Sequence, residues 1–135
     1  MRQLILGLTL VFGFAGAAFA QSEADDAMMT IQRQIEAFMK DDFETAFTYA
    51  SPGVQSIFQT PDQFRTMVQN GFPMVWRPSA VVFGATRAFG DMQLQLVDVA
   101  DEAGARYLLE YQMVRTAEGW RVAGVRILTD PRVGA

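Results

Sequence analysis

The spacing of apolar residues changes near Phe72, and this change limits the chain to one broad fold class. Before Phe72, apolar residues such as Ile31, Ile35 and Phe38 recur every three or four positions, which is typical of amphipathic helices. After Phe72 they alternate with polar residues, which is typical of strands with one buried face. Helices followed by strands predict an α+β fold, in which N-terminal helices pack on a strongly curved antiparallel sheet.

Capping residues mark the expected starts of the helices. The first helix is expected over residues 22–40, and a second, short one after a cap at Asp41 or Asp42. Ser51-Pro52 and Thr60-Pro61 each place a capping hydroxyl before a proline in the first helical position. Two further helices are therefore expected at these positions.

Strands are expected throughout the second half, separated by turn residues. Their expected ranges are 75–78, 80–89, 92–99, 105–115 and 120–128. The breaks between the last four are short and contain Gly with Asp, Glu or Thr, which favours tight turns. Short connections of this kind join antiparallel neighbours.

The apolar alternation also predicts how the two central strands pair. One strand presents Met92, Leu94, Leu96 and Asp98 on one face, and the next presents Tyr107, Leu109, Tyr111 and Met113. Both sets face the core only if Leu94 lies opposite Tyr111, because a shift of one residue sends a whole set to solvent. This register leaves residues 101–104 as the loop and places Asp98 beside Tyr107 on the buried face.

The first twenty residues have the three parts of a secretory signal peptide. Arg2 supplies a positive start, residues 4–14 form an apolar stretch, and Ala18-Phe19-Ala20 is a small-x-small cleavage site. The apolar stretch is shorter than the roughly 20 residues of a membrane span; an uncleaved anchor helix is the alternative. We expect residues 1–20 to be removed, residues 21–135 to form a single domain, and the protein to be exported to the periplasm or outside the cell, without stable membrane insertion.

Missing residue types exclude several chemistries. The chain has no cysteine and no histidine, which excludes Ser-His and Cys-His nucleophilic catalysis and removes the usual ligands of zinc, copper and haem. Without Arg2, ten Lys and Arg remain against fifteen Asp and Glu, a net charge of −5. A domain this acidic lacks the basic patch that nucleic-acid binding requires. We therefore expect no metal, no cofactor and no nucleic-acid partner.

Three stretches of the sequence carry a recognisable pattern. They are Ala50-Ser51-Pro52 with Val54, Gln55 and Phe58; residues 67–84 with Gly71-Phe72-Pro73 and Trp76-Arg77-Pro78; and Gly119-Trp120-Arg121-Val122 with Gly124. Together they resemble a bacterial family of exported proteins known only as a domain of unknown function. That family is similar to the nuclear-transport-factor-2-like superfamily, also called cystatin-like or SnoaL-like.

The resemblance implies a cone of helices wrapped by a strongly bent antiparallel sheet, with a pocket between the two, over residues 28–128. It carries no assigned activity. The wider superfamily contains ketosteroid isomerases, scytalone dehydratase and polyketide cyclases, together with non-catalytic binding or dimerising modules. A fold shared this widely does not identify a function.

Asp98 is the candidate catalytic residue. The expected register surrounds it with apolar side chains and Tyr107, and such a setting raises the pKa of a carboxyl group toward that of a general base. Alternatively, Asp98 lies at the strand end near the Asp101 turn and is solvated.

Tyr107, Tyr111, Trp76 and Arg126 are the candidate ligand-binding residues. The two tyrosines would offer hydroxyl groups to a ligand, and Trp76 would cover the pocket where the chain passes from helix to sheet. Arg126 would face inward and receive an anionic group. A bulge would instead turn Arg126 outward. Ordinary packing is the alternative for the three aromatic residues.

These observations favour a non-catalytic exported module that binds a small apolar or amphipathic ligand or a protein partner. One alternative is a cofactor-independent enzyme of the isomerase or dehydratase type that uses Asp98 and a tyrosine. Another is a structural module that forms a homodimer through the outer sheet face, where Val97, Val99, Leu108 and Val114 are expected among polar residues.

Overall fold

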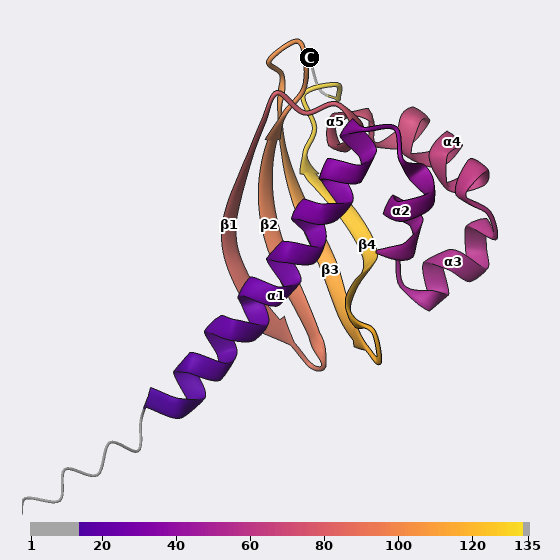
Figure 1. The fold of residues 1–135 in the computed structure, drawn as a ribbon. Helices are drawn as coiled ribbons and strands as arrows, with labels where there is room; N and C mark the ends of the chain where they lie inside the picture. The colour runs from indigo at the N-terminus through magenta and orange to yellow at the C-terminus, as the bar shows by residue number, and fades with distance from the viewer. Residues whose placement is uncertain (1–13, 134–135) are drawn as a thin grey trace, which may run out of the picture.

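The computed structural model describes residues 14–133, and these have the expected α+β architecture. The helices come first: α1 (Phe14–Met39), α2 (Phe43–Thr48), α3 (Pro52–Phe58), α4 (Pro61–Gly71) and α5 (Pro73–Trp76). The strands follow: β1 (Ala80–Phe89), β2 (Met92–Ala100), β3 (Arg106–Thr116) and β4 (Gly119–Thr129). They form one open antiparallel sheet in the order β1-β2-β3-β4. Helix α1 crosses one face of this sheet, and α2, α3 and α4 gather beside β4 (Figure 1).

Local sequence sets the starts of three helices as predicted. The Asp42 carboxylate accepts a hydrogen bond from the backbone N–H of Thr45 at 3.1 Å and caps α2. The hydroxyl groups of Ser51 and Thr60 cap α3 and α4 in the same way, each followed by a proline. Each cap satisfies a backbone N–H that has no partner within the helix.

The first helix is longer than predicted. It already runs through Phe14 and Ala18-Phe19-Ala20, so residue 22 is not its start. Residues 1–13, which hold most of the predicted signal peptide, lie outside the described residues. The buried side chains described in α1 run from Ala24 to Phe38, so they all follow the predicted cleavage site. Within residues 14–133, no helix combines the length and the hydrophobicity needed to cross a membrane.

The strand predicted over residues 75–78 was wrong. Pro73 begins the short helix α5, which buries Met74 and Val75. Proline fixes φ near the helical value, and an apolar run of this length is compatible with either a helix or a strand. The sheet starts afterwards, where the backbone N–H of Ser79 donates to the carbonyl oxygen of Ala100 at 2.8 Å.

The pairing of β2 with β3 differs by one residue from the predicted register. Gln95, not Leu94, lies opposite Tyr111. The inner face of β2 therefore carries three fully buried residues: Gln95, Val97 and Val99. Leu94 and Leu96 lie half-buried on the outer face. Ala100 lies opposite Arg106, so the loop between the strands has one residue more than predicted. Within it, Asp101 accepts hydrogen bonds from the backbone N–H groups of Gly104 and Ala105.

A bulge in β1 between Phe83 and Thr86 explains why a glutamine is buried in this sheet. The side-chain nitrogen of Gln95 donates to the carbonyl oxygens of Gly84 at 2.9 Å and Leu96 at 2.8 Å. The Thr86 hydroxyl donates to the side-chain oxygen of Gln95. A buried amide is tolerated because both of its ends are hydrogen bonded.

A second bulge, in β4, turns Arg126 away from the core. Ala123 has no opposite residue on β3, and beyond it Val125 lies opposite Tyr111 on the inner face. Arg126 consequently lies opposite Glu110 on the outer face. The inward orientation considered for Arg126 was wrong, and the alternative with a bulge is the one observed.

The segment before α3 is fastened to β4. The Ser51 N–H donates to the carbonyl oxygen of Val122 at 2.8 Å, and the Val122 N–H donates to that of Tyr49 at 2.8 Å. These two hydrogen bonds form a parallel bridge between Ala50 and Val122. They hold α3 close to β4 and thereby position the site described below.

Candidate functional site: an apolar cavity beside strand β4

A cavity of about 270 Å³ lies between α3, α4 and β4. Its walls include Val54 and Phe58 of α3, Met67 and Val68 of α4, and Val122 and Val125 of β4. An engineered cavity of about 150 Å³ admits benzene, and drug-sized ligands occupy pockets from about 300 Å³ upward. The space therefore suits an occupant of one or two rings or a short alkyl chain.

None of the side chains that line the cavity is charged, and the polar ones are Gln34 and Tyr111. The side-chain nitrogen of Gln34 donates to the carbonyl oxygen of Ala46 at 3.1 Å. Tyr111 is 1% exposed, and its hydroxyl has no hydrogen-bond partner among the described residues. Burial raises the pKa of this hydroxyl above its ordinary value of 10.0, so it remains a protonated donor at neutral pH.

Helix α3 forms the outer wall of the cavity, and none of its side chains is fully buried. Ile57, at the rim, is 71% exposed. After the helix, Gln59 has φ 68° and ψ −38°, and the Thr60 N–H donates to the carbonyl oxygen of Phe58 at 2.8 Å. A hydrogen bond that closes around one residue with positive φ is a strained γ-turn.

The two candidate tyrosines are not brought into one pocket. Both lie on the inner face of β3, but Tyr107 is not among the residues that line the cavity. The Tyr107 hydroxyl donates to Asp101 at 3.4 Å, and the Arg132 guanidinium lies 5.4 Å from the centre of its ring. The structure therefore places Tyr111 in the cavity and Tyr107 under the C-terminal segment.

Asp98 does not lie on the buried face beside Tyr107, as the predicted register required. The shift of one residue turns it to the outer face, opposite Leu108. There its carboxylate accepts a hydrogen bond from Arg106 at 3.1 Å, with 41% of the side chain exposed. Arg126 lies on the same outer face and pairs with Glu110 at 3.1 Å.

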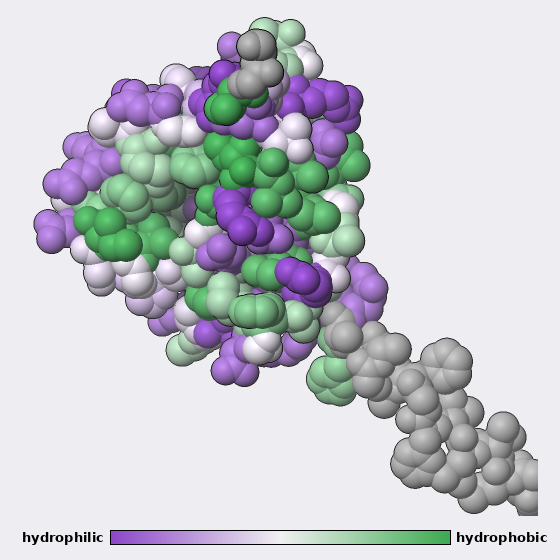
Figure 2. Space-filling model, turned by 180° about the vertical axis from the view of Figure 1, so that it is seen from behind, coloured by the Kyte–Doolittle hydropathy of each residue, from purple (hydrophilic) through white to green (hydrophobic). Residues whose placement is uncertain are grey.

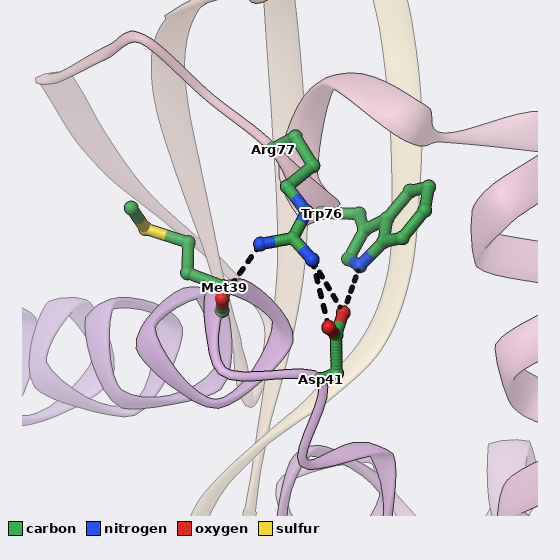
Figure 3. Close-up of polar contacts among 4 residues, drawn as sticks. All are labelled: Met39, Asp41, Trp76 and Arg77. Atoms are coloured by element: carbon green, nitrogen blue, oxygen red, sulfur yellow. Dashed lines mark hydrogen bonds and ion pairs between the residues drawn. The ribbon is translucent and has the colours of Figure 1, made fainter.

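Trp76 belongs to an exposed cluster at the end of α1, which we call the Asp41 cluster (Met39, Asp41, Trp76 and Arg77; Figure 3). The indole N–H of Trp76 donates to Asp41 at 2.8 Å. The Arg77 guanidinium donates to both carboxylate oxygens of Asp41 and to the carbonyl oxygen of Met39, each at 2.8 Å. The Trp76 hydrogen bond and the Arg77 charge lower the pKa of Asp41 below its ordinary value of 3.8. Trp76 does not line the apolar cavity; its hydrogen bond joins α5 to the turn after α1.

A family model for the Domain of unknown function (DUF4864) matches residues 17–135. The chain belongs to this family. The match spans both the cavity and the Asp41 cluster of this DUF4864 domain. No curated protein and no solved structure matches the chain. The resemblance to a domain of unknown function is thus confirmed, and the relation of that family to the nuclear-transport-factor-2-like superfamily stays a prediction.

Sequence reasoning missed most of the wall of the cavity in this DUF4864 domain. Val54 and Phe58 lie four residues apart on a short helix, a spacing that places two apolar side chains on one helix face. That signal was present but does not distinguish a cavity wall from ordinary core. From the sequence, Asp41 was read only as a possible helix cap, because its partner Arg77 is 36 residues away. Within residues 14–133, no group of three or more Asp or Glu side chains is arranged to hold a metal ion.

Proposed function

We propose that this DUF4864 protein binds a small apolar ligand in the cavity between α3, α4 and β4, without catalysing a reaction. The observation that supports this proposal is a cavity of about 270 Å³ whose lining side chains are apolar apart from Gln34 and Tyr111. Apolar walls with few polar groups are typical of small-molecule sites, where burial supplies affinity and the polar groups fix orientation.

The lining also favours binding over the isomerase- or dehydratase-like alternative. General acid–base catalysis requires a titrating group within hydrogen-bond reach of the reacting atom. That alternative relied on Asp98 and a tyrosine in one pocket, but Asp98 lies on the outer face of the sheet and Tyr111 on the inner face. No Asp, Glu or Lys side chain lines the cavity.

Two further parts of the proposal concern fold family and location. We propose a nuclear-transport-factor-2-like cone, supported by helices that precede a meandering antiparallel sheet and by a cavity between the two layers. We also propose export, supported by the three-part N-terminal sequence that ends in Ala18-Phe19-Ala20. The protein would then bind its ligand in the periplasm or outside the cell.

Titration of isotope-labelled protein with 2-acetylnaphthalene tests the site. We expect saturable NMR shifts concentrated at Val54, Val68 and Val122, which line the cavity. Val125→Phe adds bulk to the wall and should abolish these shifts. The matched control is Val114→Phe, which adds the same bulk to a half-buried valine on the outer face of β3. Equal binding by both variants, or shifts confined to other surfaces, would exclude this cavity as the binding site.

The outer sheet face favours a second candidate function, the formation of a homodimer. Figure 2 views the sheet from the side opposite α1 and shows apolar residues along this face with polar residues between them. The observed register places Leu94 and Leu96 there, half-buried, together with Val82, which is 57% exposed. Leu128, which has no opposite residue on β3 and follows the inward Ile127, is 42% exposed. The expected Val97 and Val99 face inward instead. A two-fold dimer uses the same patch on both copies.

Sedimentation equilibrium tests this second candidate. We expect a dimer for the wild-type protein and a monomer for Leu128→Glu, because a carboxylate would be buried without a partner in the interface. Ile57→Glu places the same charge at an exposed apolar residue away from the sheet and should leave the dimer intact. A monomeric wild-type protein at high concentration would exclude the candidate.

A further inference from the structure

The hydroxyl group of Tyr111 is the unusual feature of the cavity, because a buried donor without a partner destabilises a fold. Tyr111 is 1% exposed, lies on the inner face of β3 opposite Val125, and lines the cavity. Among the described residues its hydroxyl has no hydrogen-bond partner. Leaving such a group unsatisfied costs roughly 1–3 kcal/mol, and buried polar groups in folded proteins are otherwise almost always hydrogen bonded.

The neighbouring groups do not relieve this cost. Gln34, the other polar side chain of the lining, uses its nitrogen for the carbonyl oxygen of Ala46. The residue opposite Tyr111 on β4 is the apolar Val125, and the residue opposite it on β2 is Gln95, whose amide is engaged with Gly84, Leu96 and Thr86. Tyr111 lines the cavity, and its buried hydroxyl is a donor that none of its neighbours satisfies. Such a donor suits an acceptor that arrives with the ligand.

We propose that the ligand carries an uncharged hydrogen-bond acceptor, such as a ketone, ester or ether oxygen, which receives the Tyr111 hydroxyl. This proposal rests on the proposed function and specifies its ligand class. A carboxylate is disfavoured because no cationic side chain lines the cavity to compensate its desolvation. A pure hydrocarbon would fill the space but leave the hydroxyl unpaired.

Three probes of nearly the same shape distinguish these ligand classes: 2-acetylnaphthalene, 2-ethylnaphthalene and 2-naphthoate. We expect the ketone to bind wild-type protein about tenfold more tightly than the hydrocarbon, the effect of one recovered hydrogen bond. The naphthoate should bind most weakly. In Tyr111→Phe the affinity for the ketone should fall to that of the hydrocarbon, whose own affinity should not change.

Tyr107→Phe is the matched control, because Tyr107 lies on the same face of β3 but does not line the cavity. It should leave all three affinities unchanged. Tyr111→Phe should also unfold at an equal or higher temperature than the wild type, because it removes an unpaired group. If the Tyr111 hydroxyl instead stabilised the fold, Tyr111→Phe would have a lower melting temperature than the wild type.

The outcomes separate the two proposals. If none of the three probes binds the wild-type protein, the proposed function fails, and this inference fails with it. If the probes bind without preference for the ketone, or if Tyr111→Phe keeps that preference, the inference alone is overturned. If the naphthoate binds most tightly, the ligand class is anionic and the inference is wrong.

Discussion

The side-chain nitrogen of Gln95 donates a hydrogen bond to the carbonyl oxygen of Gly84 on the neighbouring strand, at 2.9 Å. This contact crosses the bulge of β1, and the Gln95 side chain that makes it is fully buried. It ties the register of β2 to the position of the bulge, because a shift of β2 by one residue would move the amide to the other face.

Gln95→Leu should therefore destabilise the fold strongly although it makes the core more apolar. The carbonyl oxygens of Gly84 and Leu96 would be left without this donor, and we expect a loss of about 2–3 kcal/mol in the free energy of unfolding, measured by urea denaturation. Gln93→Leu is the control, because Gln93 is half-buried on the same strand and makes no side-chain hydrogen bond to the described residues; its effect should stay within about 0.5 kcal/mol. Equal effects of the two substitutions would contradict a special role for Gln95.

Asp41→Ala should destabilise the protein more at neutral pH than in acid. Asp41 also has a positive φ of 57°, so alanine at this position adds a strain that does not depend on pH. The pKa of Asp41 is lowered below its ordinary value of 3.8 in the folded state, so the folded state binds this proton less tightly than the unfolded state does. The ionised carboxylate thus stabilises the fold above pH 3.8, and the contribution disappears as the pH falls through the folded-state pKa.

Melting temperatures across a pH series measure this effect. The difference between the wild type and Asp41→Ala should be largest at pH 7, and in acid it should fall to the pH-independent part that the positive φ causes. Glu102→Ala removes an exposed carboxylate of the β2–β3 loop and should show no such pH-dependent difference. A constant difference at all pH values would mean that Asp41 acts through its backbone conformation and not through its charge.

Gln59→Gly should stabilise the protein. Gln59 has a positive φ of 68° in the γ-turn after α3, and glycine adopts such a conformation without a steric penalty. Relief of strain of about 1–3 kcal/mol is partly offset by the greater freedom of glycine in the unfolded chain, which leaves a net gain of about 1 kcal/mol in thermal or urea unfolding. Gln63→Gly, in the first turns of α4, should instead destabilise by about 1 kcal/mol. A loss at both positions would argue against a strained turn.

The N-terminal segment should be cleaved after Ala20. We expect the exported protein to have the mass of residues 21–135, measured by intact mass spectrometry of the periplasmic fraction or medium. Ala20→Arg should block cleavage, because the processing site requires a small residue. A chain that starts at Gln21 should unfold at the same temperature as the longer chain, since the buried residues described in α1 begin at Ala24. Exported protein that retains Met1 would contradict the prediction.

Local features of this chain were predictable and long-range ones were not. Ser51 and Thr60 cap their helices through atoms three residues away, so the sequence alone is sufficient there. The buried face of β3 was also predicted correctly, because Tyr107, Leu109 and Tyr111 alternate with more polar residues.

The face of β2 was predicted wrongly because this strand is apolar on both sides. Leu94 and Leu96 make one face as hydrophobic as Val97 and Val99 make the other. Which of the two faces is buried depends on the hydrogen bonds between Gln95 and a bulge about ten residues away in the sequence. No local sequence pattern predicts these hydrogen bonds. The same register decides the position of Asp98. Because the observed register differs by one residue from the predicted one, Asp98, the candidate base, lies on the outer face and not in the core. The two bulges, and with them the direction of Arg126, depend on pairing between strands and not on composition.

No side chain of α3 is fully buried, and only Val54 and Phe58 pack, partly buried, against the core, so its displacement exposes less apolar surface than that of α1. Regions of this kind open locally at a small fraction of the free energy of global unfolding. Amide hydrogens of α3 should therefore exchange with solvent long before those of α1, whose Ile31 and Phe38 lie in the core. A ligand would then enter and leave while the sheet and α1 stay folded, and its residence time would be set by the motion of one seven-residue helix.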